Sequence, residues 1–168
     1  MSDWRHTFTP EQLELASLVG ARARSGKGSS TALGAQDSNQ NTRDLVGALG
    51  QIAFSEIWSG TPYTVTSLMA CRKGDDGWVE VRATYHERGH LLLYPEDADS
   101  EASPVVLVVL DRSFHSARLA GWCSIGQGMN QFMLSPPWKG GRDCHKVPQW
   151  WLRPMDELEQ VYPGTKKK

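Results

Sequence analysis

Val105-Val106-Leu107-Val108-Val109-Leu110 is the stretch of sequence that decides the fold. Six consecutive apolar residues, four of them valine, are typical of a central strand buried on both faces. The run is too short to cross a bilayer, which takes about 20 apolar residues, and the 168-residue sequence holds no run of that kind. The sequence therefore predicts a sheet built around this strand and no membrane span.

Helix and strand patterns lie on both sides of the central run. A first helix is predicted to begin at Pro10 with Thr9 as its N-cap, and a second to run from about Thr42 to Trp58. Strands are predicted at 63–69, 78–84, 91–94 and 116–124, and a short helix at 152–158. Residues 25–41, 95–104 and 125–147 are interpreted as polar, acidic and glycine-rich loops. The order predicts an α+β domain with a mixed central β-sheet flanked by helices.

Two glycines lie inside the second predicted helix. Glycine in a helix interior costs about 1 kcal/mol relative to alanine. The presence of Gly47 and Gly50 therefore predicts close packing of this helix against a neighbouring backbone.

The charge is balanced in total but divided along the chain. Lysine and arginine number 18 against 19 aspartates and glutamates, which gives a net charge of -1. Residues 61–111 hold four basic and nine acidic side chains, whereas residues 112–168 hold nine basic and four acidic. Cations and tryptophans that alternate in the last third are a candidate nucleic-acid surface, because arginine and lysine contact phosphates and rings stack on bases. Its candidate residues are Arg112, Arg118, Trp122, Lys139, Arg142 and Lys146. The alternative is a solvated, loop-rich face with buried tryptophans.

A second group of candidate site residues surrounds the strand at 78–84. Asp75 and Asp76 precede it in a turn, and Glu80 and Arg82 lie two residues apart, hence on one face of the sheet. Carboxylates that converge from a turn and a strand are suitable ligands for Mg²⁺, and a nearby cation can stabilise the charge on a cleaved phosphodiester. The alternative is an ordinary exposed Glu-x-Arg pair on a strand.

Several stretches between residues 42 and 158 follow one another in a recognisable order. They are Gly47-Ala-Leu-Gly50-Gln51-Ile-Ala-Phe54, the acidic turn and strand from Asp75 to Thr84, Leu91-Leu-Leu-Tyr94-Pro95-Glu96-Asp97-Ala-Asp99, the apolar strand at Val105, Leu119-Ala-Gly121-Trp122, Val147-Pro148-Gln149 and Leu152-Arg153-Pro154-Met155. Together they resemble a family of uncharacterised phage-type proteins with a PD-(D/E)XK nuclease-like core.

The resemblance implies DNA as substrate and Mg²⁺ as cofactor. Glu80 would be one metal ligand, and Asp75 or Asp76 the other. Arg82 takes the place of the usual lysine, and Gln51 that of a helix glutamate. Of the three catalytic positions, Glu80, Arg82 and Gln51, the last two depart from the family pattern, because arginine stays protonated and glutamine is neutral where an anion is expected.

Three functions are therefore open. The first is a metal-dependent endo- or exodeoxyribonuclease, and the second is a degraded form of it that binds DNA. The third is a non-catalytic module that targets a host protein, or a virion or assembly protein. The length favours a single domain over 1–168, with an N-terminal helix and flexible loop at 1–41, the nuclease-like core at 42–158 and a C-terminal tail at 159–168. Cys71, Cys123 and Cys144 lie far apart and predict free thiols in the cytoplasm, the host's if the protein is phage-encoded.

Overall fold

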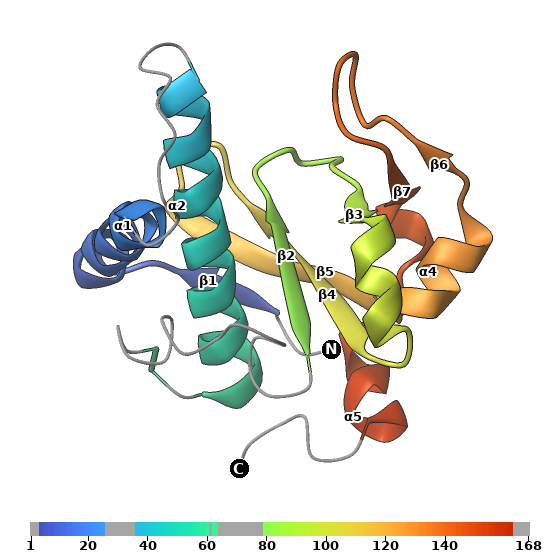
Figure 1. The fold of residues 1–168 in the computed structure, drawn as a ribbon. Coiled ribbons are helices and arrows are strands. Elements are labelled where there is room, and N and C mark those ends of the chain that lie inside the picture. The colour runs from blue at the N-terminus through green and yellow to red at the C-terminus, as the bar shows by residue number, and fades with distance from the viewer. Residues whose placement is uncertain (1–3, 26–35, 61, 64–78, 163–168) are drawn as a thin grey trace.

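The computed structural model describes residues 4–25, 36–60, 62–63 and 79–162 (Figure 1). Its centre is a mixed four-stranded sheet in the order β1-β5-β4-β2, and a second, three-stranded sheet has the order β3-β7-β6. The strands are β1 (Arg5–Thr7), β2 (Glu80–Thr84), β3 (Leu91–Leu93), β4 (Pro104–Leu110), β5 (Ser116–Ser124), β6 (Leu134–Ser135) and β7 (Cys144–Val147). The α-helices are α1 (Pro10–Ser25), α2 (Gln36–Phe54), α4 (Ile125–Gln131) and α5 (Leu158–Val161). Short helical turns are η1 (Ser55–Ser59), η2 (Pro95–Ser100), η3 (Gln149–Trp151) and η4 (Met155–Glu157).

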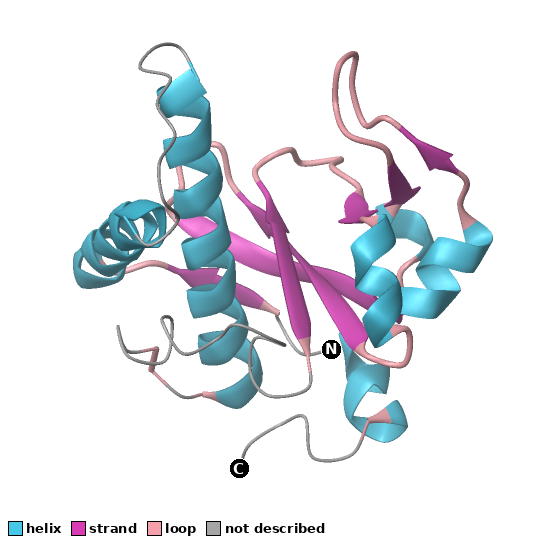
Figure 2. Cartoon of the chain, in the orientation of Figure 1, coloured by secondary structure: helices cyan, strands magenta, loops and turns pink. Residues whose placement is uncertain are grey.

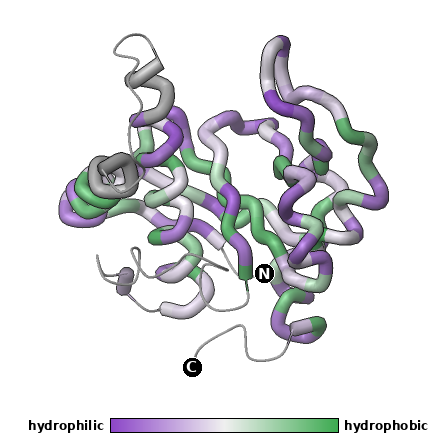
Figure 3. Tube along the Cα trace, viewed as in Figure 1, coloured by the Kyte–Doolittle hydropathy of each residue, from purple (hydrophilic) through white to green (hydrophobic). Residues whose placement is uncertain are grey.

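The strand β4 confirms the sequence prediction, because all seven of its residues are buried. It pairs antiparallel with β5 and parallel with β2, so the α+β class and the mixed sheet are confirmed as well. Side chains of β4 alternate between two apolar clusters. Val106, Val108 and Leu110 pack in the cluster with α1 and α2, and Val105, Leu107 and Val109 pack in the cluster with the second sheet and α4. Figure 2 shows helices on both sides of the central strands, and Figure 3 shows that the apolar strands lie in the middle of the molecule.

The first helix begins where the sequence predicts. The Thr9 hydroxyl accepts a hydrogen bond from the Gln12 amide at 3.3 Å, and the Gln12 side chain accepts one from the Thr9 amide at 3.0 Å. This reciprocal pair is a capping box, which satisfies two amides that the helix leaves without internal partners.

The second helix differs from its prediction at both ends. It begins at Gln36 rather than at Thr42. Once the apolar part of a helix is formed, each added residue costs little, so polar turns can extend it. After Phe54 the helical segment continues through the π-helical turn η1. Gly60 caps this turn, with a φ of 60° in the left-handed region that glycine tolerates.

The two glycines of α2 have different environments. A Cβ built on Gly50 would lie 2.5 Å from the Cβ of Ala83 on β2, so Gly50 is where the helix approaches the sheet. The prediction of close packing is confirmed at Gly50. It is wrong at Gly47, where no described atom lies within 4 Å of such a Cβ.

Residues 125–147 are not the glycine-rich loop that the sequence suggested. They contain α4, which Ser124 caps by accepting a hydrogen bond from the Gln127 amide at 3.3 Å, and the strands β6 and β7. The acidic stretch after β3 likewise forms the helical turn η2. The helix expected at 152–158 is replaced by an extended segment, the short turn η4 and the start of α5. Arg153 is extended there, because its backbone pairs with that of Trp122. The three-residue strand β1 was not predicted, and most of the strand predicted at 63–69 lies outside the described residues.

Among the described residues, no helix has both the length and the apolar character that a membrane span requires.

Candidate functional site

Glu80 and Arg82, two of the predicted catalytic residues, lie side by side on β2. One terminal nitrogen of Arg82 lies 2.9 Å from a carboxylate oxygen of Glu80 and 2.9 Å from one of Asp97 on η2. The other oxygen of Asp97 accepts a hydrogen bond from the Tyr94 amide at 2.8 Å. The guanidinium of Arg82 thus joins a strand of the first sheet to η2 and forms ion pairs with both carboxylates.

The described residues do not fit a magnesium site. Mg²⁺ requires oxygen ligands in octahedral geometry, and the cation between Glu80 and Asp97 is the Arg82 guanidinium, which cannot lose its charge. Within the described part of the chain, no three His, Cys, Asp or Glu side chains are grouped so that they could hold a metal ion. Asp75 and Asp76, the other predicted ligands, lie outside the described residues.

Gln51 is on the helix that packs against the opposite face of the sheet. Its neighbour Gly50 contacts Ala83, and Val81 lies in the same apolar cluster as α2. Since Glu80 and Arg82 alternate with Val81 and Ala83, they lie on the other face. The structure therefore brings Glu80 and Arg82 together and places Gln51 across the sheet from them.

The predicted nucleic-acid residues fall into three groups. Trp122 is fully buried, with its ring nitrogen donating a hydrogen bond to the Pro154 carbonyl at 3.0 Å, so it cannot stack on a base and that part of the prediction is wrong. Lys139, Arg142 and Lys146 belong to β7, a strand of the second sheet, and to the loop before it. Arg142 pairs with Glu96 and lies over the Tyr94 ring, 4.4 Å from its centroid. Arg112 and Arg118 form the third group.

A surface pocket of about 320 Å³ contains this third group. It lies at the end of the first sheet where β4 turns into β5, next to the segment that follows β2. Its lining consists of the cations Arg5, Arg112 and Arg118, the acids Glu87 and Asp111, the ring of Tyr85, and Val109, Leu110, Ser116 and Ala117. Guanidinium groups, one aromatic ring and a small apolar floor are a typical lining for an anionic organic ligand.

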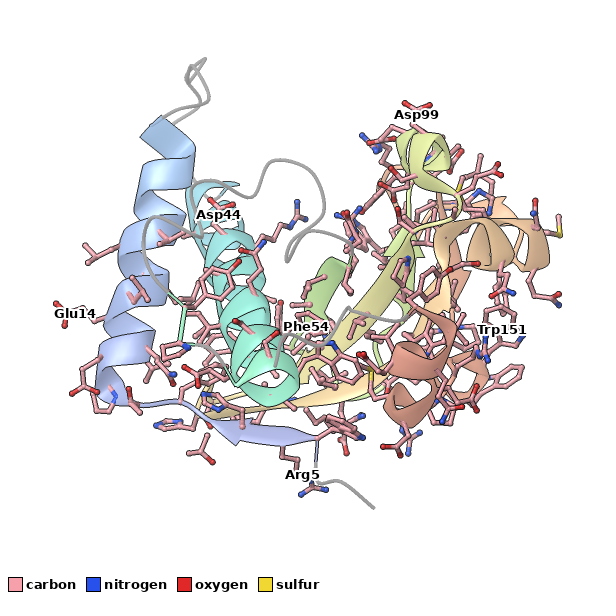
Figure 4. All side chains as sticks on the ribbon, turned by 90° about the horizontal axis from the view of Figure 1, so that it is seen from below. Arg5, Glu14, Asp44, Phe54, Asp99 and Trp151 are labelled. Carbon is pink, nitrogen blue, oxygen red and sulfur yellow. The ribbon has the colours of Figure 1, made fainter. Side chains whose placement is uncertain are left out.

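Two of these arginines are paired by the register of the sheet. β1 runs antiparallel to β5, with Arg5 directly opposite Arg118. Opposite residues in such a pair have Cβ atoms about 4.5–5.5 Å apart, and like charges there are destabilising. Figure 4 shows that Arg5 projects outward from β1. The register therefore brings two arginines together on one short stretch of surface.

Hydrogen bonds fix the side chain of Arg118 in the pocket. Arg118 donates to the Gln149 side chain at 2.8 Å, and Gln149 in turn donates to the carbonyls of Glu87 and Gly89 at 2.8 and 2.9 Å. These contacts hold the guanidinium of Arg118 against the segment after β2. The position of Arg118 is thus set before any ligand arrives.

Asp111 keeps its negative charge at the pocket, and hydrogen bonds hold its carboxylate within the β4–β5 hairpin. Its carboxylate accepts four hydrogen bonds within the β4–β5 hairpin: from the His115 amide, from the Ser116 amide and hydroxyl, and from the Ser113 hydroxyl. Burial alone would raise the pKa of Asp111, but the bonds from Ser116, His115 and Ser113 outweigh it and hold the pKa below its ordinary value. Asp111 therefore shapes the hairpin, and Glu87 is the other acid among the lining residues.

Sequence reasoning found Arg112 and Arg118 but missed Arg5 and Tyr85. Arg5 is on a three-residue strand, too short for a period-two pattern to be read. Tyr85 directly follows the predicted strand at 78–84, and its place at a strand end was the one signal that could have drawn attention to it.

Comparison with known proteins adds no further assignment. The chain matches no protein-family model, and neither the curated proteins nor the solved structures contain a significant match.

Proposed function

We propose that this protein binds DNA without cleaving it, as a phage-type protein with a PD-(D/E)XK-like fold whose metal site is degraded. The observation that carries the proposal is the placement of Arg5 opposite Arg118, at a pocket that Arg112 also lines. Such an arrangement suits a ligand with several phosphates, because each guanidinium can donate a forked pair of hydrogen bonds to phosphate oxygens. Contacts of this kind position a protein on the DNA backbone and carry no sequence information by themselves.

The Glu80–Arg82–Asp97 group supports the non-catalytic part of the proposal. A nuclease of the kind that the resemblance implies needs carboxylates available to a divalent cation. Here Arg82 lies within 2.9 Å of both carboxylates, so binding a metal at Glu80 would first require breaking these ion pairs. We infer that the group connects β2 to η2 and serves the fold. Cys123 and Cys144 are free thiols in the interior, which supports the proposal that the protein works in the cytoplasm.

DNA binding is tested by fluorescence anisotropy with a labelled oligonucleotide over a series of salt concentrations. Three arginine–phosphate contacts predict that log K falls with log salt with a slope of about -2.7 for a duplex, or about -2 for a single strand. Arg112→Ala removes an exposed cation at the hairpin, so we expect it to reduce the magnitude of the slope by about 1 and to weaken binding by about three- to tenfold.

Arg142→Ala is the matched control, because Arg142 is also exposed but is paired with Glu96 outside the pocket. It should leave both slope and affinity close to those of the unmodified protein. Absence of binding at low salt, or binding that does not depend on salt, contradicts the proposal.

The absence of cleavage is tested separately with plasmid and single-stranded DNA in the presence of Mg²⁺ or Mn²⁺. We expect both substrates to stay intact. Cleavage that disappears in Glu80→Ala would show that the strand β2 carries a working metal site and would overturn the non-catalytic assignment.

A further inference from the structure

We propose that the arginine pocket receives one unpaired nucleotide of a single DNA strand, with its base against the Tyr85 ring and its phosphate at Arg5 and Arg118. This inference rests on the proposed DNA binding and specifies which form of DNA is bound.

The pocket has an aromatic side as well as a cationic one. Tyr85 lines the pocket, and 36% of its surface is exposed. The rings of Tyr85 and His86 have centroids 4.4 Å apart and are inclined at 32° to each other. Phe114 meets Tyr85 edge-on, with a centroid distance of 5.9 Å and an angle of 84°. His86 and Phe114 thus pack on Tyr85, and Tyr85 is the ring that lines the pocket and offers a surface on which a base can stack.

The backbone at Phe114 is unusual and holds one of these rings in place. Its φ is 59°, the left-handed region that residues other than glycine seldom adopt. The Phe114 amide donates to the Asp111 carbonyl at 3.2 Å, and the Asp111 carboxylate accepts from the next two amides, those of His115 and Ser116. Asp111 therefore fixes the hairpin in the conformation that places Phe114 against Tyr85. Strained backbone of this kind is concentrated at binding sites, where it orients a group in advance.

The pocket's size and chemistry favour a single nucleotide over a stacked pair. At about 320 Å³ it is at the lower end of the range for small-ligand sites, which is the scale of one nucleotide. In a duplex the flat faces of the bases are stacked on one another, so a duplex presents phosphates to the arginines but no base face to Tyr85. An unpaired nucleotide can contact both sides of the pocket at once.

The inference predicts a preference that depends on Tyr85. We compare a fluorescein-labelled oligothymidylate with a hairpin duplex of equal phosphate number, at one salt concentration, by anisotropy. Base stacking on a protein ring contributes enough affinity that Tyr85→Leu should weaken single-strand binding by about 5- to 100-fold. The same change should alter duplex binding by less than about twofold, because phosphate contacts remain.

Two variants control for the ring and for general effects of removing an aromatic residue. Tyr85→Phe keeps the ring and should bind the single strand nearly as well as the unmodified protein. Trp138→Leu removes another exposed ring, 51% exposed and outside the pocket lining, and should have no effect. A circular dichroism melt of each variant confirms that it is folded before affinities are compared.

The possible outcomes separate the inference from the proposed function. One outcome is that duplex DNA binds as tightly as the single strand, that Tyr85→Leu has no effect, and that Arg112→Ala weakens the binding of both. In that case the proposed DNA binding is supported, and the inference that the pocket receives an unpaired nucleotide is wrong. If neither DNA binds, both are wrong. If deoxythymidine monophosphate competes at the same concentration as the oligonucleotide, the pocket is a site for free nucleotides, which also overturns the strand assignment.

Discussion

Replacing each of the two glycines of α2 by alanine should change stability in opposite directions. Both positions lie inside the same helix, so alanine gains about 1 kcal/mol of helix propensity at either one. At Gly47 the new methyl group meets no described atom within 4 Å, and the gain should appear in full as a more stable protein. At Gly50 it would lie 2.5 Å from the Ala83 Cβ, whereas carbon atoms in contact are ordinarily about 3.5–4.0 Å apart.

The helix or the strand β2 must therefore move by about 1 Å to accept Gly50→Ala. Overpacking of this size costs about 1–3 kcal/mol, which exceeds or cancels the gain in propensity. We expect Gly50→Ala to be less stable than Gly47→Ala by about 1–3 kcal/mol, a comparison in which the common propensity term cancels. Urea unfolding followed by circular dichroism measures both free energies of unfolding, with the slope m as a check that unfolding stays two-state.

A double-mutant cycle with Ala83→Gly shows whether the contact is the cause. Removing the methyl group of Ala83 should relieve the overpacking, so Gly50→Ala should be less destabilising in the Ala83→Gly background than in the unmodified one. The reasoning is refuted if Gly50→Ala stabilises the protein as much as Gly47→Ala does, or if the two substitutions at 50 and 83 are additive. In that case α2 would not approach β2 closely at this point.

Two further predictions concern titratable groups of the interior and the hairpin. Because the pKa of Asp111 is held below its ordinary value in the folded state, its contribution to stability is present above about pH 4 and is lost as the pH falls through the lowered pKa. Asp111→Asn should therefore cost about 1–2 kcal/mol at pH 7 and much less at pH 2.5, as measured by urea unfolding at both values, and an equal loss at both would contradict the role of the charged carboxylate. Burial raises the pKa of Cys123 to about 12 and excludes solvent from its thiol, so iodoacetamide at pH 8 should leave Cys123 unmodified in the folded protein and alkylate it in urea. Mass spectrometry of the peptides distinguishes the two cases, and rapid alkylation without denaturant would show that this part of the core opens.

The Glu80–Arg82–Asp97 group shows how far a local pattern can be interpreted. The two-residue spacing correctly placed Glu80 and Arg82 on one face of a strand, since side chains alternate along any strand. The pattern could not show that Arg82 also reaches Asp97, because that contact depends on where η2 lies in space. The same alternation, once Ala83 is known to face α2, separates Gln51 from the pair.

The sequence by itself determined the elements whose signals are local. The apolar run at 105–110 predicted a strand buried on both faces, because both sets of alternate positions are apolar, and β4 is such a strand. The strand at 116–124 has the predicted bounds, and the first helix begins at Pro10 behind its Thr9 cap. Each of these features depends on residues close together in the chain.

Only the tertiary structure decided which surface the arginines share. Arg5 and Arg118 become neighbours through the register of β1 on β5, and a shift of one residue would turn either side chain to the other face. Gln149 reaches Arg118, and Phe114 reaches Tyr85, across 31 and 29 residues of sequence. Contacts over such separations are set by the packing of whole elements. The division of charge along the chain could therefore suggest a basic surface, but it could not predict which arginines would line one pocket.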